Sequence, residues 1–271
     1  MRLPATTAAF FDLDKTVIAT SSAYVYGKEF LNSGLISPST AFSMSLAKAS
    51  YMVSGHSSEQ MDASRDQLSN MVTGWDVNQV KQIADDTLHT VVAPTIYAEA
   101  RDLIAHHLAA GHDVVIISAS ATVLVEPIAK ELGVRTVIAT KLEEADGKFT
   151  GNISFYCKGA AKAEAIRTLA AQNGYNLAAS YAYSDSATDL PMLETVGHPI
   201  AVNPDRTLRK IAAEREVDLK RIAAERDIKN EDIRKAQAVE QAEVERRKAI
   251  ELAEQDRAIA VAEKSRAESE A

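Results

Sequence analysis

Short apolar runs alternate with longer amphipathic stretches over the first 204 residues of the chain. Such runs are typical of buried strands, whereas apolar residues spaced three and four apart predict helices. Strands that alternate with helices indicate an α/β fold with a doubly wound, mostly parallel, Rossmann-like sheet. The predicted strands are 8–11, 113–120, 135–140, 178–186 and 198–204, and the predicted helices between them are 98–111, 123–133, 159–174 and 187–197.

Residues 17–95 interrupt this alternation with helical spacing and few strand signals. Amphipathic helices are predicted at 22–35, 37–55 and 77–92. We therefore expect a catalytic core formed by 1–16 and 96–204, with 17–95 inserted as a helical cap. A hairpin is also expected at 141–154, where Asp146 and Gly147 form a favourable two-residue turn.

The composition changes abruptly at Asp205. Residues 205–271 contain no Gly, Pro or aromatic residue, and they hold 16 Lys or Arg and 17 Asp or Glu, which is typical of one long helix. An 11-residue repeat predicts a nearly straight or slightly right-handed packing stripe and makes the segment a coiled-coil candidate. The alternative is a solvated single helix held by charge pairs. The repeat positions are Val217, Ile228, Val239, Ile250 and Val261.

Net charge, cysteine content and hydropathy limit the partners and the cellular compartment that we expect for the protein. The formal net charge of -8 argues against a nucleic-acid partner, because phosphate-binding surfaces are normally basic. Cys157 is the one cysteine, so a disulfide within the chain is impossible and a reducing compartment is expected. The sequence contains neither a recognisable leader at the N-terminus nor an apolar stretch long enough to span a bilayer. A cytoplasmic protein is the prediction.

Polar residues follow three of the predicted strands, where parallel sheets place their ligand sites. Carboxylates from two strand ends suit Mg²⁺, and a serine with a lysine suits a phosphoryl group. One aspartate could act as nucleophile, with a neighbour two positions on, on the same side of the chain, as proton donor. The candidates are Asp12, Asp14 and Thr16 after the first strand, Ser118 after the second, Lys158 before the helix at 159–174, and Asp185 and Asp189 after the fourth strand.

Each candidate also has an ordinary structural interpretation. Asp12 and Asp14 could begin a turn, and Asp185 and Asp189 could be acids favoured by the dipole of a helix N-terminus. Ser118 could be a turn residue, and Lys158 a solvated residue at a helix start. Taken together, in this order and after these strands, the residues favour a phosphoryl-transfer site.

The segments "DLDKT", "ISAS", "CKGAAK" and "YSDSATDLPM" resemble the four ordered motifs of the haloacid dehalogenase superfamily. The phosphoserine-phosphatase-like branch is the most similar, over about residues 8–210. The resemblance implies that Asp12 forms an aspartyl-phosphate and that Asp14 protonates the leaving oxygen and then activates water. It further implies that Asp12, the main-chain carbonyl of Asp14, and Asp185 bind Mg²⁺. Phosphoryl oxygens would contact Thr16, Ser118 and Lys158, and Asp189 would orient Lys158 or a metal-bound water.

The chain departs from that pattern at two places. No carboxylate occurs in "ATSSAYVYG", where phosphoserine phosphatases carry an acidic residue that reads the substrate amino group, so L-phosphoserine is doubtful as substrate. The 205–271 segment resembles the helical region of flotillin-type, band-7 proteins instead of continuing as a phosphatase. It is either a natural fusion or an engineered join near Arg215.

Three functions therefore remain open. The first is a Mg²⁺-dependent phosphomonoester hydrolase of a small phosphorylated metabolite, without a nucleic-acid or membrane-spanning role. The second is a phosphotransferase that passes the aspartyl-phosphate to another acceptor. The third is an assembly module, in which 205–271 self-associates or packs on partner helices and the globular part is a passenger.

Overall fold

A six-stranded sheet organises the computed structural model, which describes residues 7–37 and 58–214. The strand order is β4-β3-β2-β1-β5-β6, and every neighbouring pair is parallel except β3 and β4. The predicted α/β fold with a mostly parallel sheet is thereby confirmed. The strands are β1 (Ala8–Phe11), β2 (Asp113–Ala121), β3 (Thr136–Ala145), β4 (Lys148–Phe155), β5 (Tyr181–Ser184) and β6 (His198–Ala201).

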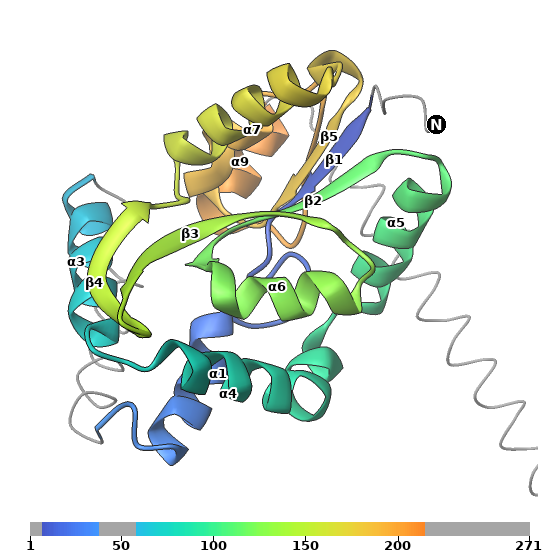
Figure 1. Ribbon diagram of the computed structural model, residues 1–271. Coiled ribbons are helices and arrows are strands. Elements are labelled where there is room, and N and C mark those ends of the chain that lie inside the picture. Colours follow the sequence, from blue (N-terminus) through green and yellow to red (C-terminus); the bar gives the residue numbers. More distant parts are fainter. Residues whose placement is uncertain (1–6, 38–57, 215–271) are drawn as a thin grey trace, which may run out of the picture. The chain divides into compact units, whose positions relative to one another are not determined.

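Helices cover both faces of this sheet (Figure 1). Strand β1 is apolar throughout because its alternate side chains enter two different hydrophobic clusters. Ala9 and Phe11 belong to the cluster on the α5 and α6 side, and Ala8 and Phe10 to the cluster on the α7 side. The covering helices are α5 (Ala98–Ala109) and α6 (Thr122–Glu131) on one face, and α7 (Ala160–Asn173), α8 (Leu190–Leu193) and α9 (Arg206–Glu214) on the other.

The described part of the region between β1 and α5, residues 12–37 and 58–97, consists mainly of helices and turns. Trp75 packs edge-on against Phe30 at a ring separation of 5.0 Å, and both side chains belong to the same hydrophobic cluster as Phe11 of the sheet. The helix predicted at 37–55 lies almost entirely outside the described residues. The described elements are α1 (Ser22–Asn32), α3 (Ser58–Val72), α4 (Val77–Thr87), a π-helical turn (Leu88–Val92) and a 3₁₀ turn (Ala93–Thr95).

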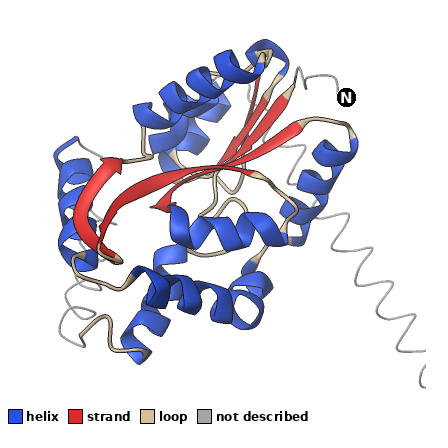
Figure 2. Ribbon diagram, in the orientation of Figure 1, coloured by secondary structure: helices blue, strands red, loops and turns tan. Residues whose placement is uncertain are grey.

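The β3–β4 hairpin is longer than expected, because the strand predicted at 135–140 continues without a break into the hairpin. Its turn has positive φ at both Asp146 (50°) and Gly147 (75°), which matches the predicted two-residue turn. The hairpin curves away to meet α3 (Figure 2). Its Phe149 exchanges main-chain hydrogen bonds with the turn after α3, accepting from Gly74 N at 2.8 Å and donating to Trp75 O at 3.0 Å.

The helix predicted at 187–197 is much shorter in the structure. A 3₁₀ turn (Ala187–Asp189) leads into α8, which ends at Leu193. The chain then turns tightly so that Gly197 N donates to Leu177 O at 2.8 Å. A β-carbon at Gly197 would lie 1.9 Å from the Ala178 carbonyl oxygen, so this close approach requires glycine.

The long C-terminal helix can be compared with the structure only at its start. Helix α9 begins at Arg206, one residue after the predicted change of composition. Residues 215–271, with nearly all of the 11-residue repeat, lie outside the described residues, so the coiled coil and its likeness to flotillin-type proteins stay predictions. Across the described ranges, no helix combines the length and apolarity that crossing a membrane requires.

Candidate active site

Three adjacent parallel strands bring the candidate residues to one edge of the sheet. Strand β1 lies between β2 and β5. Asp12 and Asp185 directly follow β1 and β5, and Ser118 lies within the last part of β2. Asp12 N donates to Tyr183 O at 2.9 Å and so continues the β1–β5 pairing one residue beyond the strand. The first candidate carboxylate is therefore held by the main chain of the sheet.

Lys162 joins two of the predicted carboxylates. Its Nζ donates to Asp12 Oδ1 at 2.6 Å and to Asp189 Oδ2 at 2.7 Å. Asp189 Oδ2 also accepts from Ser184 Oγ at 2.8 Å. Lys162 is 2% exposed, Asp12 6% and Asp189 3%, so the group is almost completely shielded from water. Ion pairs this deeply buried are retained in proteins only with hydrogen bonds as good as these.

The predicted lysine, Lys158, lies four residues before Lys162. It precedes the N-cap Gly159 of α7 and is half-buried, and its pKa is lowered by burial although Asp189 opposes the shift. Asp189 is predicted to orient Lys158 or a metal-bound water, and in the structure its carboxylate accepts a hydrogen bond from Lys162. One signal could have found Lys162: it lies four residues before Ile166, on the buried stripe of α7, where a lysine needs a charged partner.

Asp14 is bound by the beginning of α1. Its Oδ1 accepts from Ser22 N at 3.0 Å, and its Oδ2 accepts from Ser21 Oγ at 3.2 Å. Burial raises the pKa of Asp14, and these hydrogen bonds partly offset the shift because they favour the carboxylate. Asp14 thus lies close to the end of β1, and its carboxylate is hydrogen-bonded to the start of α1.

Thr16 and Ser118 both make hydrogen bonds to main-chain amides. Thr16 Oγ1 accepts from Asp185 N at 3.0 Å and ties the loop after β1 to the loop after β5. Ser118 Oγ accepts from Ser120 N at 3.1 Å, and the residue is 1% exposed. Lys15, between Asp14 and Thr16, adopts a left-handed conformation with φ of 59°, which a residue with a side chain rarely takes.

Negative charge is in excess at this edge. Burial raises the pKa of Asp12 to about 8, with Lys162 opposing the shift, and burial raises the pKa of Asp185 to about 6. The nearby Asp189 raises the pKa values of Asp12 and Asp185 further, because like charges that are buried away from water disfavour each other. A divalent cation would relieve this repulsion.

Carboxylate and main-chain oxygens are donors that Mg²⁺ accepts. Over the described part of the chain, no three His, Cys, Asp or Glu side chains are grouped so that they could hold a metal ion. Mg²⁺ is usually bound by one or two carboxylates, with waters and substrate phosphate completing its shell. Asp12, Asp185 and the main-chain oxygen of Asp14 are the residues that could supply such a set.

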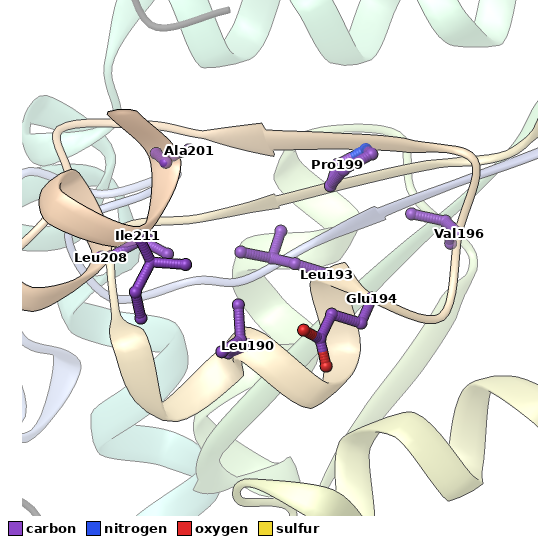
Figure 3. Close-up of a pocket in the computed structure, with 9 residues that line it drawn as sticks. Leu190, Leu193, Glu194, Val196, Pro199, Ala201, Leu208 and Ile211 are labelled. Atoms are coloured by element: carbon purple, nitrogen blue, oxygen red, sulfur yellow. The ribbon is translucent and has the colours of Figure 1, made fainter. Parts of the chain in front are cut away.

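An apolar pocket lies elsewhere, between α8, β6 and the start of α9 (Figure 3). None of the predicted site residues lines it, and Glu194 is its one charged lining residue. It offers no group for phosphoryl chemistry. Its other lining residues are Leu190, Leu193, Val196, Pro199, Ala201, Leu208, Ile211 and Ala212.

Comparisons with known proteins agree with the fold. The model of the haloacid dehalogenase-like hydrolase family matches residues 9–194. A protein of Mycobacterium tuberculosis named as a probable phosphatase is 53% identical over 211 residues, which are 78% of this chain and 74% of that protein. A phosphoserine phosphatase of the same species is 34% identical over 212 residues, 78% of this chain and 69% of that one.

A solved structure shows the same architecture. The crystal structure of a protein of unknown function from Bordetella pertussis is 29% identical, covers 78% of this chain and 97% of its own, and superposes with a TM-score of 0.69. The family match spans the core and the inserted region alike. The chain belongs to the haloacid dehalogenase-like hydrolases, as a phosphatase of the branch related to phosphoserine phosphatases.

Proposed function

We propose that the protein is a Mg²⁺-dependent phosphomonoester hydrolase that acts on a small phosphorylated metabolite through an aspartyl-phosphate at Asp12. One observation carries the proposal above the others: a buried ammonium, Lys162, is bonded to Asp12 and Asp189 at the strand end. Phosphate monoesters are among the slowest biological substrates to hydrolyse unaided, so their catalysis depends on positioned charges.

Asp12 is the proposed nucleophile. Its carboxylate and a substrate phosphate repel each other, and the Lys162 ammonium at 2.6 Å reduces that repulsion. Bound Mg²⁺ would supply further charge neutralisation for the transferring group. Since Asp12 N is fixed to Tyr183 O, the carboxylate has a defined direction of attack toward the site.

Asp14 is the proposed general acid and base. Its raised pKa favours retention of a proton that it would give to the leaving oxygen. The resulting carboxylate would then take a proton from the water that hydrolyses the aspartyl-phosphate. The hydrogen bonds from Ser21 and Ser22 stabilise that carboxylate form.

The remaining residues bind or position. Ser118 and Lys158 are proposed ligands of the phosphoryl oxygens, as the sequence suggested, and Lys162 joins them as the cation already in place. Asp189 fixes Lys162, and Thr16 fixes the loop that carries Asp185. The inserted segment 17–95 is proposed as the cap that excludes bulk water from the reacting phosphate.

The test is release of phosphate from p-nitrophenyl phosphate, with and without Mg²⁺, by the parent and by Asp12→Asn. We expect Mg²⁺-dependent turnover that is lost in Asp12→Asn. Asp113→Asn is a matched control, because Asp113 lies at the opposite end of β2 and accepts from Tyr175 there. Activity retained by Asp12→Asn would contradict the nucleophile assignment.

The same assay separates hydrolysis from phosphotransfer. Equal amounts of p-nitrophenol and inorganic phosphate mean that water is the acceptor. More p-nitrophenol than phosphate, in the presence of added alcohols or nucleosides, would identify the phosphotransferase alternative instead.

A further inference from the structure

Helix α1 connects two parts of the proposed site through a pair of hydroxyl groups, of which that of Ser22 is buried and that of Ser120 half-buried. Ser22 has no exposed surface, and its Oγ lies 2.5 Å from Ser120 Oγ. We propose that Ser22 and Ser120 are positioning residues, which hold Asp14 in register with the phosphate-binding loop so that it can protonate the leaving group. This inference rests on the proposed function and assigns roles to Ser22, which lies outside the four motifs, and to Ser120, the last residue of "ISAS", to which the resemblance gives no role.

A continuous chain of hydrogen bonds supports the assignment. Ser22 N donates to Asp14 Oδ1 at 3.0 Å, Ser22 Oγ pairs with Ser120 Oγ, and Ser120 N donates to Ser118 Oγ at 3.1 Å. The proposed acid and the proposed phosphate ligand are thus joined through one residue of the inserted region. Any displacement of Ser22 relative to Ser120 moves the amide that holds Asp14.

A second contact fixes α1 along the same segment. Tyr26 OH donates to Leu124 O at 3.3 Å, and Tyr26 is fully buried. Tyr26 follows Ser22 by four residues, so the two contacts lie one turn apart along α1. On the other side, they involve Ser120 near the end of β2 and Leu124 in the first turn of α6. Two anchors at this spacing prevent α1 from sliding or rotating against the loop that carries Ser118.

The hydroxyl pair is energetically interdependent. Ser120→Ala leaves the buried Ser22 hydroxyl without this hydrogen bond, which costs more than the same loss at an exposed position. Ser22→Ala removes the same bond from the half-buried Ser120 hydroxyl. General acid catalysis requires the donor to lie within hydrogen-bond reach of the leaving oxygen. A small shift of α1 would therefore weaken proton donation more than it would weaken attack by Asp12, which is held by the sheet.

Leaving groups of different basicity test this directly. A weakly basic leaving group such as p-nitrophenolate needs little protonation, whereas the more basic phenolate needs the acid. For Ser22→Ala and Ser120→Ala, we expect kcat/KM for phenyl phosphate to fall about tenfold more than for p-nitrophenyl phosphate, within the range that general acids contribute. Asp14→Asn removes the proposed acid itself, so it should show the largest selective loss of kcat/KM for phenyl phosphate.

The control is Ser180→Ala. Ser180 is equally buried, and its hydroxyl is also hydrogen-bonded, to Ala8 N and Asn176 O, but it lies just before β5 at the opposite edge of the sheet. We expect this variant to lose stability without a change in the ratio of the two kcat/KM values. The double variant Ser22→Ala/Ser120→Ala should be no more selective than either single variant, because both remove the same contact.

Two results would overturn the inference. One is an equal fall of kcat/KM for both substrates in Ser22→Ala, which would mean that the residue only supports folding. The other is additive shifts of the urea unfolding midpoint in the single and double variants, which would mean that the hydroxyls are not coupled. The unfolding series does not depend on activity, so it decides the pairing even if the parent hydrolyses neither ester and the proposed function fails.

Discussion

The ammonium of Lys162 lies 2.6 Å from the carboxylate of Asp12, and the two side chains are 2% and 6% exposed. Lys162 reaches the strand end from the first turn of α7, whereas Asp12 reaches it from β1. This contact closes a separation of 150 residues in the chain and unites the two halves of the site. We therefore expect both the stability of the fold and the proposed chemistry to depend on this pair.

Lys162→Met should reduce both properties. Removal of one partner leaves Asp12 and Asp189 buried without their cation, which costs about 3–5 kcal/mol in comparable cases. Loss of a preorganised charge at the phosphoryl group should also lower kcat by about 100-fold or more. Urea unfolding and p-nitrophenyl phosphate turnover measure the two effects.

Lys158→Met is the control for that change. The residue is half-buried and lies outside the helix, so we expect a smaller loss of stability than at Lys162. If Lys158 binds the phosphoryl group as predicted, its removal should raise KM. Equal losses of stability for the two lysine variants would contradict the importance of the Lys162 pair.

Thr16→Val should weaken the metal-binding edge. The substitution keeps the shape of the side chain but removes the acceptor of Asp185 N, at a cost of about 1–3 kcal/mol for an unsatisfied buried amide. Because this amide positions Asp185, the Mg²⁺ concentration for half-maximal activity should rise. Thr16→Ser should restore both values; an unchanged Mg²⁺ requirement in Thr16→Val would separate Thr16 from metal binding.

Gly151→Ala should disturb the contact between the hairpin and α3. Its φ is 89°, and an added β-carbon would lie 2.2 Å from Thr73 Oγ1. Gly147→Ala provides a comparison, because its φ is also positive at 75° but no atom lies within 4 Å of the added carbon. Backbone strain alone costs about 1–2 kcal/mol, so a greater loss of unfolding free energy is expected at Gly151 than at Gly147. Equal losses of unfolding free energy in the two variants would mean that Thr73, which directly follows α3, moves away from the added β-carbon without cost.

His107 should make stability depend on pH. Its ring nitrogens contact His112 Nδ1 and Tyr183 OH, each at 2.8 Å, and burial with neighbouring His112 and His106 lowers its pKa from 6.5 to about 4. The unfolded chain therefore binds a proton between pH 6.5 and 4 that the folded protein excludes. The stabilisation is complete above pH 6.5 and declines, by up to about 3 kcal/mol, as the pH falls to 4.

A variant isolates this contribution. The raised pKa values of Asp12 and Asp185 act in the opposite direction, since their folded forms bind protons more readily, so the parent alone does not reveal the histidine. Compared with His107→Gln, the parent should lose its relative advantage in unfolding free energy between pH 7 and pH 4.5. A difference that is constant across this range would show that His107 does not titrate as expected.

Much of the fold could be predicted because its signals are local. The apolar residues of β1 and β2 must be buried on both faces, and the Asp146–Gly147 turn matches a hairpin directly. The length of β3 and the early end of α8 could not be predicted so easily. The length of β3 depends on hydrogen bonds between the hairpin and the turn after α3, which is distant in sequence. The early end of α8 depends on the close approach of Gly197 to Ala178.

The candidate residues that lie at strand ends could be predicted from the sequence. Asp12 and Asp185 follow β1 and β5, Ser118 lies near the end of β2, and the order of these three strands brings the residues to one edge of the sheet. The position of the Lys162 side chain at the site depends on where α7 begins, since a helix shifted by one turn would have placed Lys158 beside Asp12 instead. The capture of Asp14 by Ser22 depends on how the chain reverses between them, for which the sequence contains no local signal.

The most direct measurement of the central claim is the mass of the protein after rapid mixing with p-nitrophenyl phosphate and Mg²⁺ and quenching in acid. Asp14→Asn is the variant to use, because it can form the aspartyl-phosphate from this good leaving group but hydrolyses it slowly. The account predicts a gain of one phosphoryl group on the peptide that contains Asp12, with release of one p-nitrophenol per protein molecule. Turnover without any phosphorylated peptide, or a phosphoryl group on another residue, would contradict it.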